Sequence, residues 1–146
     1  MQSKVRRIQS APPIYVGDLE KQTRDNTNFR EVLFTGPNIQ LVLMSLKPKE
    51  DIGDEVHEHT DQFIRVEEGE VLCMINDEKH YIVEAGGAII IPAGTQHNIV
   101  NRGKRPAKLY TVYGPPHHLP NTIQETKKEA EEDKVDEEAD ANEDNE

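Results

Sequence analysis

Residues 86–101 of the chain read GGAIIIPAGTQHNIVN. The apolar residues 88–91 predict a short strand, and Pro92 and Gly94 predict a sharp turn at its end. His97 then begins a returning strand. We therefore expect an antiparallel pair of strands that directs the imidazole of His97 into the mouth of a β-barrel.

Short apolar runs separated by turn residues extend over much of the chain. Each run ends near glycine, proline or asparagine, and no window between residues 29 and 113 shows a helical period. The runs include residues 32–34, 39–46, 71–75, 81–83 and 109–113. About eight or nine short strands with turns between them are typical of an all-β sandwich or barrel. The sequence therefore predicts an all-β fold.

Composition divides the 146 residues into three parts. Residues 1–28 are polar and contain proline and glycine, which predicts an irregular N-terminal arm with one strand at most. Residues 29–120 hold the apolar runs and should form the barrel. Residues 121–146 form an acidic C-terminal tail, which we expect to be partly helical near residues 123–132 and then disordered, because its charge density opposes compaction.

Charge and cysteine content exclude several classes of protein. The chain has 17 basic and 28 acidic residues, a net charge of −11, which argues against nucleic-acid binding through phosphate contacts. Cys73 is the single cysteine, so an intrachain disulfide is excluded and the chain is consistent with a reducing cytosol. Because no apolar run approaches roughly 20 residues and no secretory signal is evident, we expect a cytoplasmic protein with no membrane partner.

The strand predicted at residues 40–46 is apolar at both odd and even positions. Such a strand should be covered on both faces. The sequence therefore predicts a homodimer in which a second copy covers the outer face.

Two segments resemble the motifs of the cupin superfamily. The spacing of Gly86, Pro92, Gly94, His97 and Asn101 resembles the second cupin motif, G-x5-P-x-G-x2-H-x3-N. Residues 53–62, GDEVHEHTDQ, followed by Gly69, resemble a modified first motif. The resemblance covers about residues 30–118 and implies a small single-domain cupin with a jelly-roll barrel, also called a double-stranded β-helix. Residues 55–62 and 109–118 also resemble a subgroup labelled mannose-6-phosphate isomerase-like.

The resemblance implies a metal site, for which Glu55, His57, His59, Gln62 and His97 are the candidate ligands. Gln62 stands where the family usually has a glutamate, and it keeps an oxygen donor without the negative charge. Taking His57 as the second ligand leaves four residues before Gln62, as the motif requires, whereas taking His59 leaves two. This spacing favours Glu55 over His59 as the remaining ligand. Nitrogen and oxygen donors suit one divalent ion: Mn, Fe, Co, Ni or Zn.

The cavity below this site is expected to be apolar. If Gln62 points inward, Ile64 and Val66 share its face, and Ile99 shares a face with His97. Besides the ligands, only Tyr110 is expected to supply a proton carrier, and no basic residue is predicted on the inward face. His117 and His118 follow a proline pair in an exit turn and are expected to have a structural or rim role.

Three functions are compatible with these features. The first is a metal-dependent enzyme acting on a small polar, sugar-like substrate as an isomerase. The second is a metal-dependent dioxygenase or other oxidoreductase with an apolar pocket. The third is a non-catalytic module that binds a small ligand or serves as a scaffold, with its acidic tail meeting a basic partner. Fold alone does not choose among them.

Overall fold

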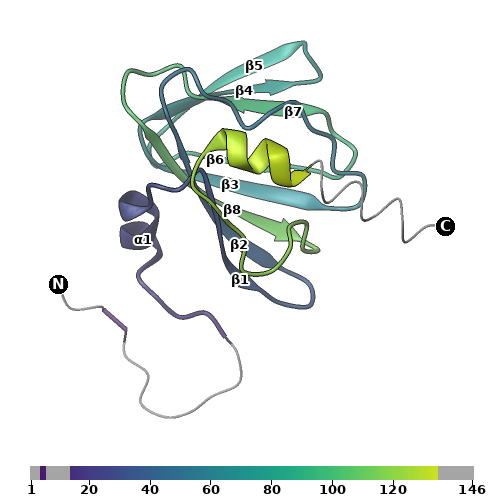
Figure 1. Ribbon diagram of the computed structural model, residues 1–146. Coiled ribbons are helices and arrows are strands. Elements are labelled where there is room, and N and C mark those ends of the chain that lie inside the picture. The colour runs from purple at the N-terminus through teal and green to yellow at the C-terminus, as the bar shows by residue number, and fades with distance from the viewer. Residues whose placement is uncertain (1–3, 6–13, 135–146) are drawn as a thin grey trace.

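The computed structural model describes residues 4–5 and 14–134. Within them, one short helix precedes nine strands (Figure 1). The elements are α1 (Leu19–Asp25), β1 (Arg30–Thr35), β2 (Gln40–Leu46), β3 (Asp61–Glu68), β4 (Glu70–Ile75), β5 (Lys79–Glu84), β6 (Ala88–Ile91), β7 (His97–Val100), β8 (Ala107–Gly114) and β9 (Ile123–Gln124). Residues 127–134 are also helical.

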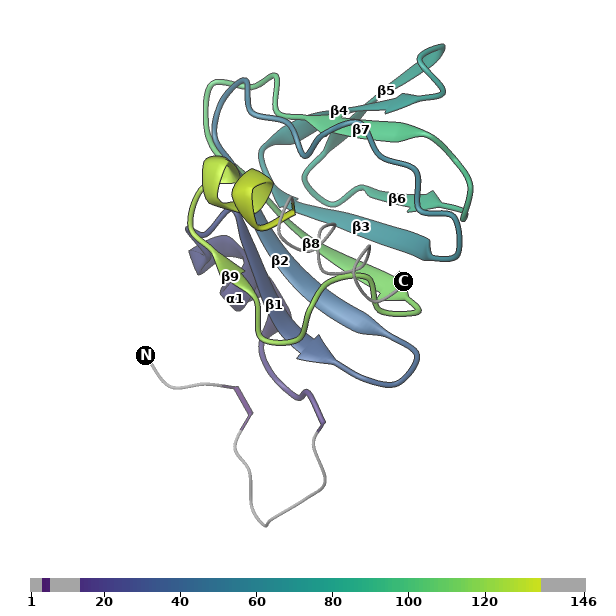
Figure 2. The same ribbon diagram turned by 45° about the vertical axis from the view of Figure 1, so that its right-hand side comes forward.

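The strands form two antiparallel sheets that enclose one core. The larger sheet has the order β6-β3-β8-β2-β1-β9, and the smaller has the order β5-β4-β7. Figure 2 shows the smaller sheet facing the larger one. This arrangement fits a double-stranded β-helix and confirms the predicted all-β fold.

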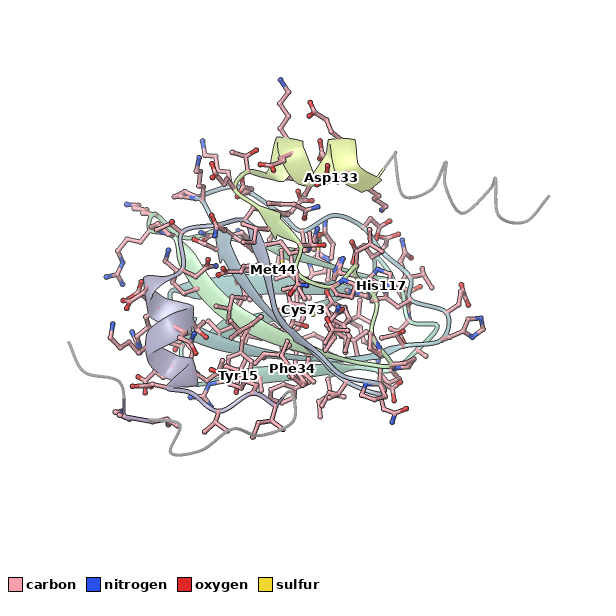
Figure 3. All side chains as sticks on the ribbon, turned by 60° about the horizontal axis from the view of Figure 1, so that its bottom comes forward. Tyr15, Phe34, Met44, Cys73, His117 and Asp133 are labelled. Atoms are coloured by element: carbon pink, nitrogen blue, oxygen red, sulfur yellow. The ribbon has the colours of Figure 1, made fainter. Side chains whose placement is uncertain are left out.

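Alternating side chains fill the space between the sheets. On β3, Gln62, Ile64 and Val66 are buried, as the predicted parity requires, and Ile99 of β7 is 1% exposed. Met44 and Cys73, which are labelled in Figure 3, belong to the same buried cluster. Removing such side chains from water is the main driving force for folding. The strand period therefore determines which side chains reach the interior.

Two turns position the strands of the site. Asn76 and Asp77 both have positive φ, as a tight turn between β4 and β5 requires. Gly94 has φ of 81° in the turn between β6 and β7, a conformation that glycine adopts without strain. The backbone N–H of Gly94 donates to the carbonyl of His57 over 2.8 Å. The turn that precedes His97 is thereby attached to the segment that carries His57.

The N-terminal region differs from its predicted irregular structure. Residues 19–25 form α1, whose N-cap Asp18 accepts a hydrogen bond from the Lys21 backbone. This helix packs against β2, β3 and β8. It covers part of the outer face of β2, so the apolar character of that strand does not itself require a second chain. The homodimer stays a prediction.

The C-terminal helix begins later in the chain than predicted. Ile123 and Gln124 pair with β1 as strand β9, so the helix begins at residue 127 and not near residue 123. The helix continues to residue 134, and the rest of the predicted acidic tail, residues 135–146, lies outside the described residues. No helix in the described ranges is long and apolar enough to cross a membrane.

Candidate metal centre

The segment between β2 and β3 lies beside β7 and brings the two motifs together. Glu55 and His97 form an isolated antiparallel bridge, in which each backbone N–H donates to the other residue's carbonyl over 2.9 Å. Alternate residues of an extended segment point to the same side. Glu55 and His57 therefore both face His97, although they are about forty residues away from it in sequence.

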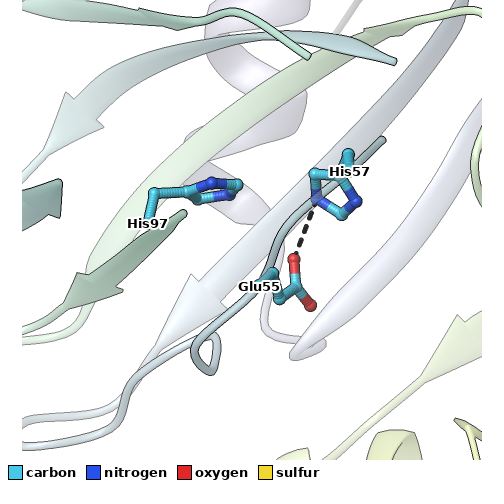
Figure 4. Close-up of side chains that lie close together, drawn as sticks. All are labelled: Glu55, His57 and His97. Carbon is cyan, nitrogen blue, oxygen red and sulfur yellow. Dashed lines mark ion pairs between the residues drawn. The ribbon is translucent and has the colours of Figure 1, made fainter. Parts of the chain in front are cut away.

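Glu55, His57 and His97 form a group of potential metal ligands (Figure 4). Each offers one ligand atom, and these atoms lie within 4.8 Å of one another. His57 is 7% exposed and His97 is 3% exposed. The His57 Nε2 atom lies 3.0 Å from Glu55 Oε2. This contact is an ion pair, and His57 Nε2 has no hydrogen-bond partner among the described residues.

The tautomer of His97 is fixed by the turn before it. Its Nδ1 atom lies 2.9 Å from the carbonyl oxygen of Thr95. Because a carbonyl only accepts, Nδ1 carries the proton and the lone pair is on Nε2. Metal-ligating histidines are typically oriented by such a bond from their second nitrogen.

Gln62 presents an oxygen atom without a partner. Its amide nitrogen donates to Thr111 Oγ1 over 3.0 Å and to the Tyr113 hydroxyl over 3.2 Å. These bonds fix the orientation of the amide and leave Oε1 as the free end. Oε1 is buried and has no hydrogen-bond partner in the described part of the chain. An unsatisfied buried oxygen is rare and needs an explanation, such as a bound cation.

The donor set therefore fits a divalent metal. Two buried atoms without a hydrogen-bond partner among the described residues, His57 Nε2 and Gln62 Oε1, belong to the predicted site, and His57 Nε2 contacts only the Glu55 carboxylate. Imidazole nitrogens with carboxylate and amide oxygens suit a first-row divalent ion. His59, in contrast, is exposed and stands outside the group that contains Glu55 and His57. The exposed side chain of His59 favours the ligand set that uses Glu55, which stays a prediction.

Sequence reasoning chose the wrong tyrosine for the interior. Tyr110 stacks near Phe63 with 6.2 Å between ring centroids, and β8 instead buries Thr111 and Tyr113. Alternate residues of a strand share a face, so Tyr113 points to the same side as Thr111. The sequence does not show which of the two faces of β8 is the inner one. Burial raises the pKa of Tyr113, so its hydroxyl stays protonated at neutral pH.

His117 lies at the rim of the metal group. Its ring centroid is 4.2 Å from that of His57 and 5.6 Å from that of Tyr113. Desolvation, and then the charge of His57, lower the pKa of His117 to about 4. The exit turn after β8 therefore returns to the mouth of the barrel, which confirms a rim position for this residue.

Glu55 remains ionised despite its position. Burial raises its pKa, but the contact with His57 and the charges of Arg30 and His117 lower the pKa by more than burial raises it. The net shift is downward. Glu55 can therefore supply a negative charge to a cation at neutral pH.

A pocket of about 380 Å³ adjoins the metal group. It is lined by Glu55 and His117, by Arg30 of β1, and by the helix at residues 127–134. This helix lies beside the space between the two sheets in Figures 1 and 2. Arg30 corrects the expectation that no basic residue faces inward. It was missed because the sequence does not show that β1 passes the mouth of the barrel.

Comparison with known proteins is consistent with this fold and site. A family model described as a cupin domain matches residues 42–113. The chain is 41% identical to YrkC of Bacillus subtilis over 82% of its own length and 67% of the relative. It is 44% identical to protein L612 of Acanthamoeba polyphaga mimivirus, over 80% of the chain and 74% of the relative. The chain therefore belongs to the cupin family.

A solved structure also matches the fold of this chain. The crystal structure of BH2720 from Bacillus halodurans matches with a TM-score of 0.80 and 46% identity. The match covers 82% of this chain and 94% of the other. The predicted cupin barrel is therefore confirmed, and the subgroup suggested by the motifs stays a prediction.

Proposed function

We propose that this cupin is a metal-dependent enzyme that acts on a small polar, sugar-like substrate and transfers a proton as an isomerase does. The observation that carries the proposal is the group of half-buried Glu55 with buried His57 and His97, together with the free oxygen of Gln62, beside an open pocket. A metal site next to a concave pocket is the usual arrangement of a catalytic site.

The four proposed ligands have different tasks. Glu55 supplies the single negative charge, while His57, Gln62 and His97 supply neutral donors. A divalent metal held there would polarise a substrate oxygen. Because Gln62 replaces a carboxylate, the centre would keep more positive charge than a site with two acidic ligands.

His117 supports the isomerase direction. Its imidazole contacts His57 and lines the pocket, so one nitrogen can accept a proton from a substrate carbon bound there. Tyr113 contributes indirectly, because its hydroxyl accepts from the Gln62 amide. We therefore assign the role of proton carrier to His117 in place of Tyr110. The mannose-6-phosphate isomerase-like subgroup is the source of the first substrates to test.

Proton exchange in deuterated water tests this function. The metal-loaded protein is incubated with aldoses, ketoses and mannose 6-phosphate, and the substrate C–H signals are followed by NMR. We expect deuterium at the carbon next to the carbonyl and the appearance of the isomer. His57→Ala should lose this activity, while His80→Ala, at an exposed position on β5, should retain it.

Two results would contradict the proposal. The first is no exchange with any substrate while the protein holds its metal. The second is oxygen consumption by the iron-loaded protein with thiols or catechols, which would indicate the dioxygenase alternative.

A further inference from the structure

Arg30 is a buried cation that forms no ion pair with the described residues, although its charge acts on Glu55 of the same pocket. It is 7% exposed and lines the pocket next to Glu55. No acidic group in the described ranges lies within ion-pair distance of its guanidinium. Buried charges are normally paired, because removing them from water is costly. Arg30 is therefore an exception that needs an explanation.

The hydrogen bonds of Arg30 are also incomplete. Its NH1 group donates to Gln124 Oε1 over 2.9 Å, and the Gln124 amide nitrogen donates in turn to Asp133 over 3.0 Å. The Nε atom is buried and has no partner among the described residues. Gln124 thus holds one side of the guanidinium, and the described residues provide no acceptor for Nε.

A structural role accounts for only part of this arrangement. The guanidinium lies 5.3 Å from the ring centroid of Phe29, a distance at which a cation is attracted to an aromatic face. This contact stabilises the charge but gives no acceptor to Nε–H. An oxygen acceptor is the missing group.

The other charges around the pocket are mostly compensated. Lys127 is paired with Asp51 and lies 3.9 Å from Glu131. Asp54 accepts a hydrogen bond from Gln96. Lys134, at the exposed end of the helix, has no ion-pair partner in the part of the chain that the structure describes. Glu55 lies 3.0 Å from His57. Arg30 is therefore the buried charge of this pocket that has no ion-pair partner among the described residues.

We propose that this pocket binds a small hydroxylated carboxylate, whose carboxylate accepts from Arg30 while its hydroxyl oxygens face the metal group. This deepens the proposed function, on which it rests for the role of the ligand as substrate. One buried guanidinium matches the single charge of a carboxylate. A phosphate dianion would require a second buried cation, and Lys134 is exposed.

Binding of matched ligands to the full-length protein tests the proposal. D-gluconate carries the carboxylate, D-glucose lacks it, and glucose 6-phosphate carries a phosphate instead. Calorimetry gives the affinities, and the ¹⁵N-edited NMR signal of the Arg30 Nε–H group reports contact without any variant. We expect gluconate to shift that signal and glucose to leave it unchanged.

Variants then measure what Arg30 contributes. Arg30→Met should weaken gluconate binding about tenfold or more, because the charge-assisted hydrogen bond to the carboxylate is lost. Arg30→Lys keeps the charge but loses the planar fork, and serves as the second variant if Arg30→Met fails to fold. Arg102→Met removes an exposed arginine outside the pocket and should leave the affinity unchanged.

Three results would overturn the proposal. They are equal affinity for gluconate and glucose, an Nε–H signal that does not respond, or tighter Arg30-dependent binding of glucose 6-phosphate than of gluconate. The proposed function fails separately. If gluconate binding depends on Arg30 but no proton exchange occurs, only the isomerase function is contradicted. If Arg30→Met still exchanges protons on neutral sugars, only the proposed carboxylate ligand is contradicted.

Discussion

At the scale of single residues, Gln62 stands at a position where the first cupin motif usually has a glutamate. The amide lacks the charge of a glutamate, but Thr111 and Tyr113 hold its nitrogen and direct its oxygen outward from that pair. Partners that orient a ligand typically change metal affinity when they are removed. The predicted role of Gln62 therefore depends on two residues of β8.

Replacing Thr111 with valine tests this orientation. Thr111→Val keeps the shape of the side chain but removes an acceptor for the Gln62 amide nitrogen. We expect metal affinity to fall about tenfold to a hundredfold, measured by competition with a chelator of known affinity. Thr122→Val removes a hydroxyl that bonds only to the Leu119 carbonyl and is the matched control. Equal affinity in both variants would contradict the role given to Thr111.

The sequence motifs select candidate ligands, but they do not show which residues surround them. His57, Gln62 and His97 were chosen from motif spacing, which is a local property. Arg30 and Tyr113 were missed because they reach the site only through the pairing of β1 and β8 in the closed barrel. Register between distant strands cannot be derived from one chain's composition.

At the scale of elements, the helix at residues 127–134 is attached to the rim of the barrel. Lys127 forms an ion pair with Asp51, which also accepts from Asn98 over 2.8 Å. The sequence predicted a helix in this region from its glutamates and lysines. It did not predict β9, because the pairing of Ile123 and Gln124 with β1 is a tertiary contact.

The Asp51–Lys127 pair should make stability depend on pH. Burial raises the pKa of Asp51, but its bonds to Lys127 and Asn98 lower it more, so its folded pKa lies below 3.8. The pair therefore stabilises the fold above that pH, and the contribution is lost as the pH falls through the folded pKa. Lys127→Gln should lower the free energy of unfolding by about 0.2–1 kcal/mol at pH 7.

Urea unfolding at pH 7 and below pH 3.8 measures this difference. Lys128→Gln, which changes an exposed residue of the same helix, is the control and should not alter stability. A deficit in Lys127→Gln that persists unchanged in acid would show that the pair is not its cause.

At the scale of the whole molecule, the proposed ligands come from segments that are far apart in the sequence. Residues 55 and 57 come from the connection to β3, whereas His97 begins β7 of the smaller sheet. A metal would therefore join parts of the barrel that separate on unfolding. The all-β class and the single barrel could be predicted because strand period and turn residues recur throughout the chain.

Metal binding should stabilise the folded protein. A ligand present at a hundred times its dissociation constant adds about 2.7 kcal/mol when it binds only the folded state. We expect a matching rise in the free energy of unfolding on metal addition, and its loss with EDTA. His57→Ala should show no such rise. Stabilisation of His57→Ala equal to that of the native chain would place the metal elsewhere.

The metal content of the protein, purified without chelator or a nickel column, tests the central claim most directly. We predict about one divalent ion per chain by elemental analysis, lost in both His57→Ala and His97→Ala and retained in His59→Ala. An absence of metal in the native protein, even after reloading, would contradict a metal centre at Glu55, His57, Gln62 and His97.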